Sequence, residues 1–215
     1  MPEPIAARIY VLAGANGAGK SSIGGEAFRA AGVEFYNPDL ATRRLLAANP
    51  GLSEHDANAA AWNQGRELLE RAIRERLDFA FETTLGGTTM TSLLALAADA
   101  LIEVRVWHVG LETPQLHLER VRRRVAKGGH DIPEAAVRRR YDQSRRNLIR
   151  LMSRLTELKV FDNSAEGDPD AGVAPAPRLL LHWRAGRIAA PADFVDTPAW
   201  AKPIVAAALK LARRG

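Results

Sequence analysis

Hydrophobic and polar residues alternate along this chain with two periods, one typical of strands and one typical of helices. Short apolar runs rich in β-forming residues predict buried strands, and longer segments with apolar residues three or four positions apart predict helices. The predicted strands span residues 8–13, 33–36, 79–83, 101–109 and 158–161. The predicted helices span residues 20–31, 38–48, 53–77, 88–98, 114–126, 131–155 and 198–214. Strands that alternate with helices predict a parallel sheet covered on both faces.

Capping signals mark where several of these helices begin. Ser53 is followed three residues later by Asp56, and Thr113 is followed by Pro114 at the first helical position. Gly128-Gly129 interrupts the chain, and residues 131–134 (Asp-Ile-Pro-Glu) then read as a second capping box. The two helices on either side of this break predict a hinged helical hairpin, about residues 113–155, that stands off the sheet as a lid.

The last quarter of the chain carries a different pattern. Residues 165–177 are rich in Ala, Pro, Gly and Asp and predict an exposed loop. Residues 178–183 and 187–189, joined by Ala185-Gly186, predict a β-hairpin. With the final helix they form a C-terminal unit of about residues 178–214. We expect residues 1–215 to form a single domain.

Composition narrows the class of protein. There is no cysteine, which excludes disulfides and thiolate metal sites, and 47% of the residues are hydrophobic, enough for a substantial core. No apolar run approaches the roughly 20 residues of a membrane span, and the N-terminus does not read as a signal peptide. We therefore expect a cytoplasmic protein that does not bind membranes.

Positive charge is concentrated in the predicted lid. Residues 119–150 hold eleven Lys or Arg against four acids, a net of +7, whereas the whole chain carries +5. Arginine dominates this block, and its guanidinium group suits bidentate contacts with phosphate. A solvated helix face is the alternative explanation for most of these residues.

One motif carries the strongest chemical signal. Residues 14–21 match the Walker A pattern G-x-x-x-x-G-K-[ST], and they lie between a predicted strand and a predicted helix. In such a loop the backbone N–H groups surround phosphate oxygens, the lysine reaches the β- and γ-phosphates, and the serine hydroxyl binds Mg²⁺. The predicted nucleotide-binding residues are Gly14, Ala15, Asn16, Gly17, Ala18, Gly19, Lys20, Ser21 and Ser22.

With this loop, the sequence predicts both the fold class and the cofactors. The fold class is α/β: a three-layer αβα P-loop domain with a mostly parallel five-stranded sheet, a helical lid, and a C-terminal β-hairpin and helix. ATP and Mg²⁺ are the expected cofactors, with Lys20 as a catalytic residue and Ser21 as the metal ligand. No N-K-x-D motif for reading guanine occurs in the chain, which makes a GTPase the weakest alternative.

Two acids lie where phosphoryl transfer needs a carboxylate. Asp39 follows the second predicted strand, and Glu82 lies at the end of the third. Ligands of open α/β sheets bind outside the carboxyl ends of the strands, where both acids fall. A kinase needs such a group to orient or deprotonate the acceptor hydroxyl. The alternatives are a helix-start acid for Asp39 and a surface charge for Glu82.

Beyond the phosphate loop, several motifs occur in an order that resembles the zeta toxin family of P-loop kinases. They span roughly residues 8–164: Gly14-Ala15-Asn16-Gly17-Ala18-Gly19-Lys20-Ser21-Ser22, Asn37-Pro38-Asp39, Phe81-Glu82-Thr83-Thr84, Arg124-Val125-Ala126-Lys127-Gly128-Gly129-His130-Asp131-Ile132-Pro133, Val137-Arg138-Arg139-Arg140-Tyr141 and Asp162-Asn163-Ser164. The phosphate loop is widely shared, whereas the later motifs in this order are more specific.

The resemblance implies ATP-dependent phosphorylation of a hydroxyl on a sugar nucleotide such as UDP-N-acetylglucosamine. It implies Asp39 as general base, Glu82 and Thr83 as acceptor contacts, and Arg124 as a catalytic cation over the transferring phosphate. A second catalytic arginine comes from residues 138–140. Arg140 is our choice, although the sequence does not settle it. The resemblance also leaves an antitoxin partner protein open.

The sequence is also compatible with other functions. The acceptor could be another small hydroxyl compound, such as an antibiotic or a nucleoside. The protein could also be an ATP-switched nucleic-acid-binding module, a less favoured hypothesis because it leaves Asp39 without a role. Trp62 is expected to pack in the core, with the border of an acceptor pocket as the alternative. Asn163, at the end of the fifth predicted strand, is expected to approach the adenine on the basis of its position alone.

Overall fold

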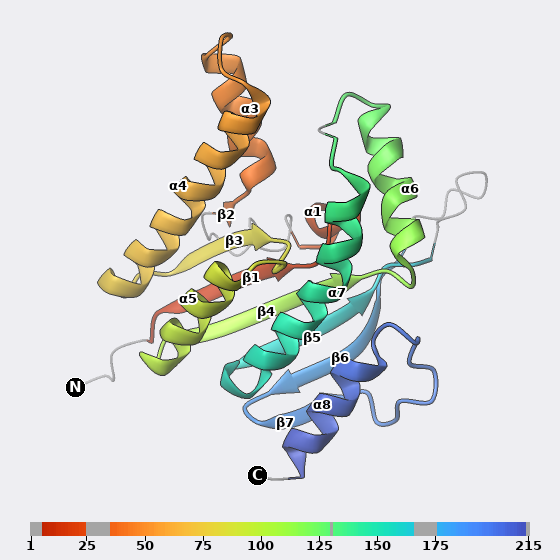
Figure 1. Ribbon diagram of the computed structural model, residues 1–215. Coiled ribbons are helices and arrows are strands. Elements are labelled where there is room, and N and C mark those ends of the chain that lie inside the picture. The colour runs from red at the N-terminus through yellow and green to blue at the C-terminus, as the bar shows by residue number, and fades with distance from the viewer. Residues whose placement is uncertain (1–5, 25–34, 130, 166–175, 214–215) are drawn as a thin grey trace.

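The computed structural model describes residues 6–24, 35–129, 131–165 and 176–213 (Figure 1). The strands are β1 (Arg8–Ala13), β2 (Phe35–Tyr36), β3 (Phe79–Thr83), β4 (Glu103–Gly110), β5 (Glu157–Asp162), β6 (Arg178–Arg184) and β7 (Arg187–Ala190). The helices are α1 (Lys20–Ile23), α3 (Pro38–Ala48), α4 (Glu54–Glu75), α5 (Thr88–Asp99), α6 (Pro114–Val125), α7 (Glu134–Leu151) and α8 (Lys202–Ala212), with a 3₁₀ turn at Met152–Arg154. Strands and helices therefore alternate through the β5 strand, as the sequence predicts.

All of the strands belong to one sheet, in the order β2-β3-β1-β4-β5-β6-β7. The β1 strand is central and pairs in parallel with both β3 and β4, while β5 continues the parallel run beside β4. The predicted α/β class is confirmed, but the predicted count of five strands is wrong. The C-terminal hairpin joins the sheet because β6 pairs antiparallel with β5, covering an edge that would otherwise expose unpaired backbone groups.

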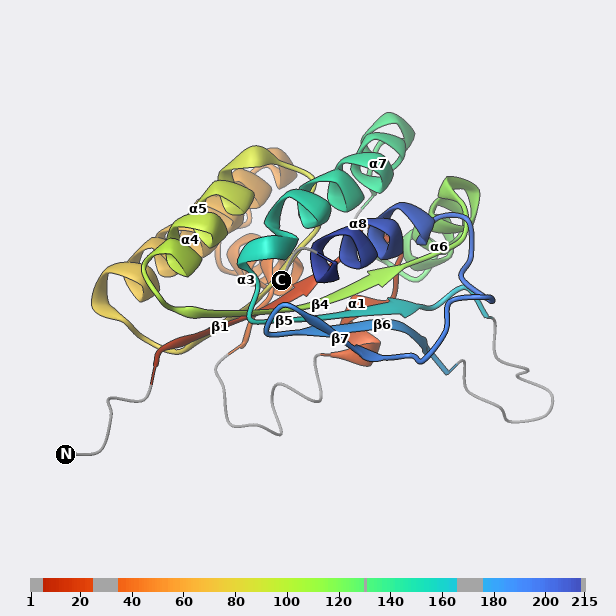
Figure 2. The same cartoon turned by 90° about the horizontal axis from the view of Figure 1, so that it is seen from below.

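The two faces of the sheet have different coverings. Side chains alternate along β1, so that Ile9 and Val11 point into the larger hydrophobic core while Tyr10 and Leu12 point into a smaller cluster on the other face. Helices α4, α5, α7 and α8 lie on the first face, and α1 lies on the second (Figure 2). The three-layer arrangement follows from this alternation.

Two helical hairpins rise beyond the carboxyl ends of the parallel strands (Figure 1). One consists of α3 and α4, and the other of α6 and α7. The α6–α7 hairpin has a small apolar core of its own, formed by Leu118, Val121, Ile132 and Val137. The strands thus end between two elevated walls.

Some predicted boundaries differ from the structure. The predicted capping box at residues 131–134 is wrong: α7 has Pro133 at its N-cap and no side-chain cap, and the carboxylate of Asp131 accepts a hydrogen bond from the Ile132 amide at 2.8 Å. The β4 strand begins at Glu103, two residues late, because Leu101 adopts φ 58° in the turn after α5. The last part of the predicted helix 20–31, the start of the predicted strand 33–36 and most of the predicted loop 165–177 lie outside the described residues.

One histidine is buried where the sheet meets two helices. His108 of β4 is 2% exposed, and its Nε2 lies 3.1 Å from the Ser144 hydroxyl of α7. Its ring centroid is 6.2 Å from that of Trp200, which precedes α8. Burial lowers the pKa of His108 to about 3, and the positive charges of Lys20 and Arg145 add to the effect. The folded protein therefore keeps this imidazole neutral.

This burial predicts an acid-labile core. An unfolded histidine takes up a proton near pH 6.5, whereas folded His108 does so only near pH 3, so the unfolded state binds more protons between these values. The free energy of unfolding should fall with falling pH in this window, by about 1.4 kcal/mol per pH unit for this residue. In His108→Leu that part of the slope should be lost, as measured by urea unfolding at pH 7, 6 and 5.

The control is His55→Leu, because His55 is exposed at the start of α4. We expect this control to keep the slope of the wild-type protein. An unchanged slope in His108→Leu would show that His108 does not carry the pH dependence. A lower stability at pH 7 alone decides nothing, since the Ser144 hydrogen bond is also lost.

Candidate active site

The phosphate loop follows β1 and is confined by backbone on two sides. Gly14, Gly17 and Gly19 have φ values of 140°, 81° and 81°, which side chains strongly disfavour. A Cβ at Gly14 would lie 2.1 Å from the carbonyl oxygen of Val109, and one at Gly17 would lie 2.6 Å from that of His117. The glycines therefore let the loop fit between β4 and α6, which is a stronger constraint than the motif alone expresses.

Two side chains from distant segments hold the loop in shape. The Asn163 amide, just after β5, donates a hydrogen bond to the Ala18 carbonyl at 2.9 Å. His117 Nδ1 lies 2.7 Å from the Asn16 carbonyl oxygen, and burial lowers the pKa of His117 to about 4. The imidazole is thus neutral near pH 7, and its Nδ1–H donates to that carbonyl. Sequence reasoning missed both roles; for Asn163, the available signal was its place at the end of the strand beside β4.

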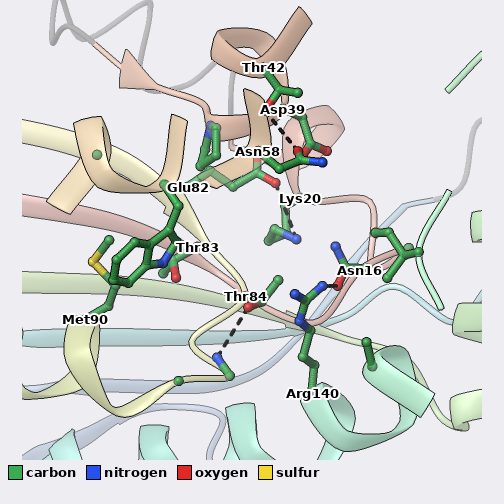
Figure 3. A pocket seen from close by; sticks show the side chains of 18 of the residues that line it. Asn16, Lys20, Asp39, Thr42, Asn58, Glu82, Thr83, Thr84, Met90 and Arg140 are labelled. Atoms are coloured by element: carbon green, nitrogen blue, oxygen red, sulfur yellow. Dashed lines mark hydrogen bonds and ion pairs between the residues drawn. The ribbon is translucent and has the colours of Figure 1, made fainter. Parts of the chain in front are cut away.

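A single carboxylate joins the loop to its surroundings. Glu82 at the end of β3 is 12% exposed, and its Oε1 lies 3.3 Å from the Nζ of Lys20. Its Oε2 accepts hydrogen bonds from the Ser21 hydroxyl and from the Asn37 amide, each at 3.0 Å. Lys20 also donates to the Ala15 carbonyl at 3.3 Å. Figure 3 shows Lys20 and Glu82 at the centre of the pocket.

The two residues predicted to contact the acceptor, Glu82 and Thr83, both line the pocket. Glu82 lies against the phosphate loop, and Thr83 lines the same pocket while its hydroxyl accepts a hydrogen bond from the Leu85 amide at 3.1 Å. The Ser21 hydroxyl oxygen and Glu82 Oε2 lie 3.0 Å apart, and both are oxygen ligands of the kind that hard metal ions prefer. Such a donor pair fits Mg²⁺, which binds protein through one or two oxygen ligands together with substrate phosphates. Among the described residues, no group of three or more His, Asp or Glu side chains could hold a metal ion by itself.

Asp39 is positioned by the start of α3. The Asn37 side chain caps this helix by accepting from the Leu40 amide at 3.0 Å, with Pro38 at the first helical position. Asp39 therefore lies in the first turn, where the helix dipole favours a negative charge. Its Oδ2 is 3.1 Å from Nη1 of Arg124 in α6, so this ion pair bridges the two walls above the sheet.

The structure distinguishes the three consecutive arginines of α7. Arg140 points toward the phosphate loop, and its Nη1 donates to the Asn16 side-chain oxygen at 2.8 Å (Figure 3). Arg138 instead pairs with Glu134 one turn earlier, at 2.7 Å. Arg139 also lines the pocket. Burial lowers the pKa of Arg140, with repulsion from Arg139 adding to the effect and Asp39 opposing it.

These residues meet in a cavity of about 820 Å³ between the two helical hairpins. Its charged end holds Lys20, Ser21, Glu82, Arg124 and Arg140. Residues of α3, α4 and α5 line it as well. A smaller cavity of about 390 Å³ adjoins it and is lined by Arg43, Arg120, Arg123, Arg124, Lys127, Gly128 and Gly129. The basic block of the sequence thus contributes a positive field beside the phosphate loop.

The fold and this loop define a P-loop nucleotide-binding domain. A family model described as an AAA domain matches residues 9–148, well over half of the chain. The chain therefore belongs to the AAA-domain family. An uncharacterised protein of Haemophilus influenzae is 30% identical over 129 residues, covering 60% of this chain and 88% of that protein.

In the part of the chain that the structure describes, no helix is long and apolar enough to span a membrane.

Solved structures share the arrangement at low sequence identity. AvrRxo1-ORF1 in complex with AvrRxo1-ORF2 and ATP matches with a TM-score of 0.64 and 15% identity over 94% of this chain. This chain spans 63% of the length of that one. A structure from the PezAT chromosomal toxin–antitoxin system of Streptococcus pneumoniae matches with a TM-score of 0.53 and 14% identity, covering 74% of this chain and 68% of that chain. At these levels of identity, the similarities show that the fold is shared.

The Asn163 contact predicts an effect on nucleotide affinity. In Asn163→Ala the buried Ala18 carbonyl loses its side-chain donor, which costs about 1–2 kcal/mol and loosens the loop. We expect the dissociation constant of Mg-ATP to rise about 5- to 30-fold, measured by isothermal titration calorimetry.

The adjacent Ser164→Ala is the matched control. Its hydroxyl contacts Asp162 and the Glu112 amide instead of the loop. We expect this variant to bind Mg-ATP with wild-type affinity. Equal affinities for all three proteins would mean that Asn163 is not needed to hold the loop.

Proposed function

We propose that this protein is an ATP-dependent kinase that transfers the γ-phosphoryl group to a hydroxyl of a small acceptor. The observation that carries the proposal is the position of Asp39. The carboxylate of Asp39 lines the same cavity as the phosphate loop. It comes from α3, whereas Lys20 begins α1. A kinase needs a carboxylate across from the phosphate loop to orient or deprotonate the acceptor hydroxyl.

The proposed reaction follows from these positions. Asp39 accepts the proton of the acceptor hydroxyl while that oxygen forms a bond to the γ-phosphorus. The bond between the γ-phosphorus and the β–γ bridging oxygen breaks, and ADP leaves with that electron pair. Lys20, Arg124 and Arg140 stabilise the charge that spreads over the equatorial oxygens. Mg²⁺ bound by Ser21 and Glu82 would neutralise the phosphates.

A sugar nucleotide such as UDP-N-acetylglucosamine is the proposed acceptor. The support is the ordered series of motifs that resembles the zeta toxin family, together with the fold shared with the PezAT structure. A cavity of about 820 Å³ also has room for more than the end of a triphosphate. Glu82 and Thr83, which line this cavity, are the proposed contacts to the acceptor.

The decisive test is Asp39→Asn. Loss of the general base should lower kcat for acceptor phosphorylation by about 10²- to 10⁴-fold. Binding of Mg-ATP should be largely kept, because Asp39 does not touch the loop. Mass spectrometry of UDP-N-acetylglucosamine incubated with Mg-ATP measures the gain of one phosphate.

The matched control is Asp99→Asn. Asp99 forms an ion pair with Arg154 at 3.1 Å, the same separation as the Asp39–Arg124 pair, but it lies outside the cavity. We expect the control to retain full activity. No phosphate gain in the wild-type protein would reject this acceptor and direct the search to antibiotics, nucleosides and other hydroxyl compounds. Full activity in Asp39→Asn would remove Asp39 from the mechanism.

A second prediction compares two arginines of α7. Arg140→Gln should lower kcat by about 10²- to 10³-fold, because Arg140 reaches the phosphate loop. Arg138→Gln removes the same charge two residues away, where the side chain pairs with Glu134, and should change kcat less than about threefold. Steady-state kinetics with Mg-ATP measures both. Equal losses would indicate a general effect of charge instead of a contact with the transferred phosphate.

Toxicity and an antitoxin partner belong to the same proposal. The PezAT system contains a toxin and an antitoxin, and the AvrRxo1 structure contains two proteins. If this chain modifies a sugar nucleotide needed for growth, its induced expression should arrest growth. The Asp39→Asn variant should not. A protein inhibitor is then expected to restore growth by covering the open cavity.

A further inference from the structure

One face of α4 forms a wall of the active-site cavity. The cavity-lining residues of this helix are His55, Asn58, Ala59, Trp62 and Gly65. Their spacing of three or four residues places them on a single helical face. The proposed reaction assigns no role to this wall.

Trp62 is unusual among the tryptophans of this chain. Its side chain is 43% exposed, while Trp183 and Trp200 are 2% and 3% exposed. Trp107 packs against Phe161, with a centroid separation of 5.6 Å. Among the described residues, Trp62 is the only exposed Phe, Tyr or Trp side chain. Its indole ring therefore offers an apolar face to the cavity instead of filling the core, contrary to the packing role expected from the sequence.

The space beside Trp62 is shaped by small residues and a fixed ring. A Cβ at Gly65 would lie 2.7 Å from Cε1 of Tyr36, so the Tyr36 ring lies directly against the helix at this point. The Tyr36 hydroxyl contacts Gln64 at 3.2 Å, which fixes the ring. Ala59 contributes a methyl group only. Met90 of α5, 8% exposed, lines the same cavity and adds a polarisable side chain.

Polar side chains lie beside Trp62 on the same wall. The Thr42 hydroxyl of α3 contacts the Asn58 side-chain oxygen at 3.0 Å, which sets the orientation of the amide (Figure 3). His55 lies one turn before Asn58 on the same face. Thr42 also lies one turn after Asp39 on α3, and both line the cavity. The proposed base is therefore connected to this wall through one helix and one hydrogen bond.

We propose that this wall binds a nucleobase of the acceptor, stacked on Trp62 and contacted along its edge by Asn58 and His55. The inference rests on the proposed kinase activity and narrows its substrate class to nucleotide-linked acceptors. An exposed tryptophan in a concave, partly polar site suits a planar heteroaromatic ring, since stacking on an aromatic side chain is worth about 1–3 kcal/mol per base. An acceptor without a base would lack this aromatic stacking contact.

The first experiment measures binding without turnover. The protein is saturated with a non-hydrolysable ATP analogue, and UDP-N-acetylglucosamine and N-acetylglucosamine 1-phosphate are titrated in parallel by calorimetry. The two ligands share the amino sugar and one phosphate, and the first adds a second phosphate, a ribose and a base. The Trp62 variants separate the contribution of the base from that of the added phosphate and ribose. We expect the base-containing ligand to bind at least about 10-fold more tightly in the wild-type protein, because about 1.4 kcal/mol of stacking corresponds to a tenfold difference.

Two substitutions then separate aromatic stacking from bulk. Trp62→Leu keeps an apolar side chain and should remove most of the preference for the base-containing ligand. Trp62→Phe keeps an aromatic ring and should retain at least part of it. Leu77→Ala is the control, since Leu77 is also 43% exposed but lies outside the cavity. Affinity for the ATP analogue should be unchanged in all three variants.

The outcomes separate this inference from the proposed function. Preference for the base in the wild-type protein, lost in Trp62→Leu, supports the stacking site even if no phosphate is transferred. Equal binding of the two ligands, or an unchanged preference in Trp62→Leu, overturns the inference even if acceptor phosphorylation is observed. Weaker binding of the ATP analogue in Trp62→Leu also overturns it, because Trp62 would then contact the adenine of ATP.

Discussion

The site depends on one nearly buried carboxylate. Glu82 meets the ammonium group of Lys20, the hydroxyl of Ser21 and the amide of Asn37, and so joins β3, the phosphate loop and the start of α3. A carboxylate that is 12% exposed is stable only when it is paired and hydrogen-bonded. Each partner comes from a segment whose position matters for catalysis. The same contacts that compensate for burying this charge therefore hold the phosphate-binding residues and the capping residue of the Asp39 helix in register.

The sequence predicts the parts of this site that depend on local rules. The glycines of residues 14–19, and the order of strand, loop and helix around them, follow from patterns within a few residues. Contacts between distant segments were not predictable in this way. Asn163 and His117 hold the loop from 145 and 101 residues away, and no local pattern encodes those pairings. The hairpin that extends the sheet was missed as a sheet member for the same reason, because strand order is a property of the assembled fold.

The arginines of the α6–α7 hairpin show how tertiary packing selects among equivalent residues. Arg138, Arg139 and Arg140 are chemically identical, and helical spacing alone assigns none of them a role. The rotation of α7 is set by its buried face, where Val137 and Ser144 pack inward. That rotation directs Arg140 to Asn16 and leaves Arg138 to pair with Glu134. Burial lowers the pKa of Arg140, which means that its charge is held at some energetic cost and gains more from a phosphate than an exposed charge would.

The charged groups of the site already have partners within the protein. Lys20 contacts Glu82, Arg124 contacts Asp39, and Arg140 contacts Asn16. Binding of a triphosphate would therefore exchange internal contacts for contacts with the ligand, instead of neutralising bare cations. The Asp39–Arg124 pair has the strongest consequence, because the carboxylate oxygen that contacts Arg124 is not available to an acceptor hydroxyl. In the proposed reaction, this oxygen can contact the acceptor only once Arg124 turns toward the phosphates. This exchange would couple the readiness of the base to the presence of the nucleotide.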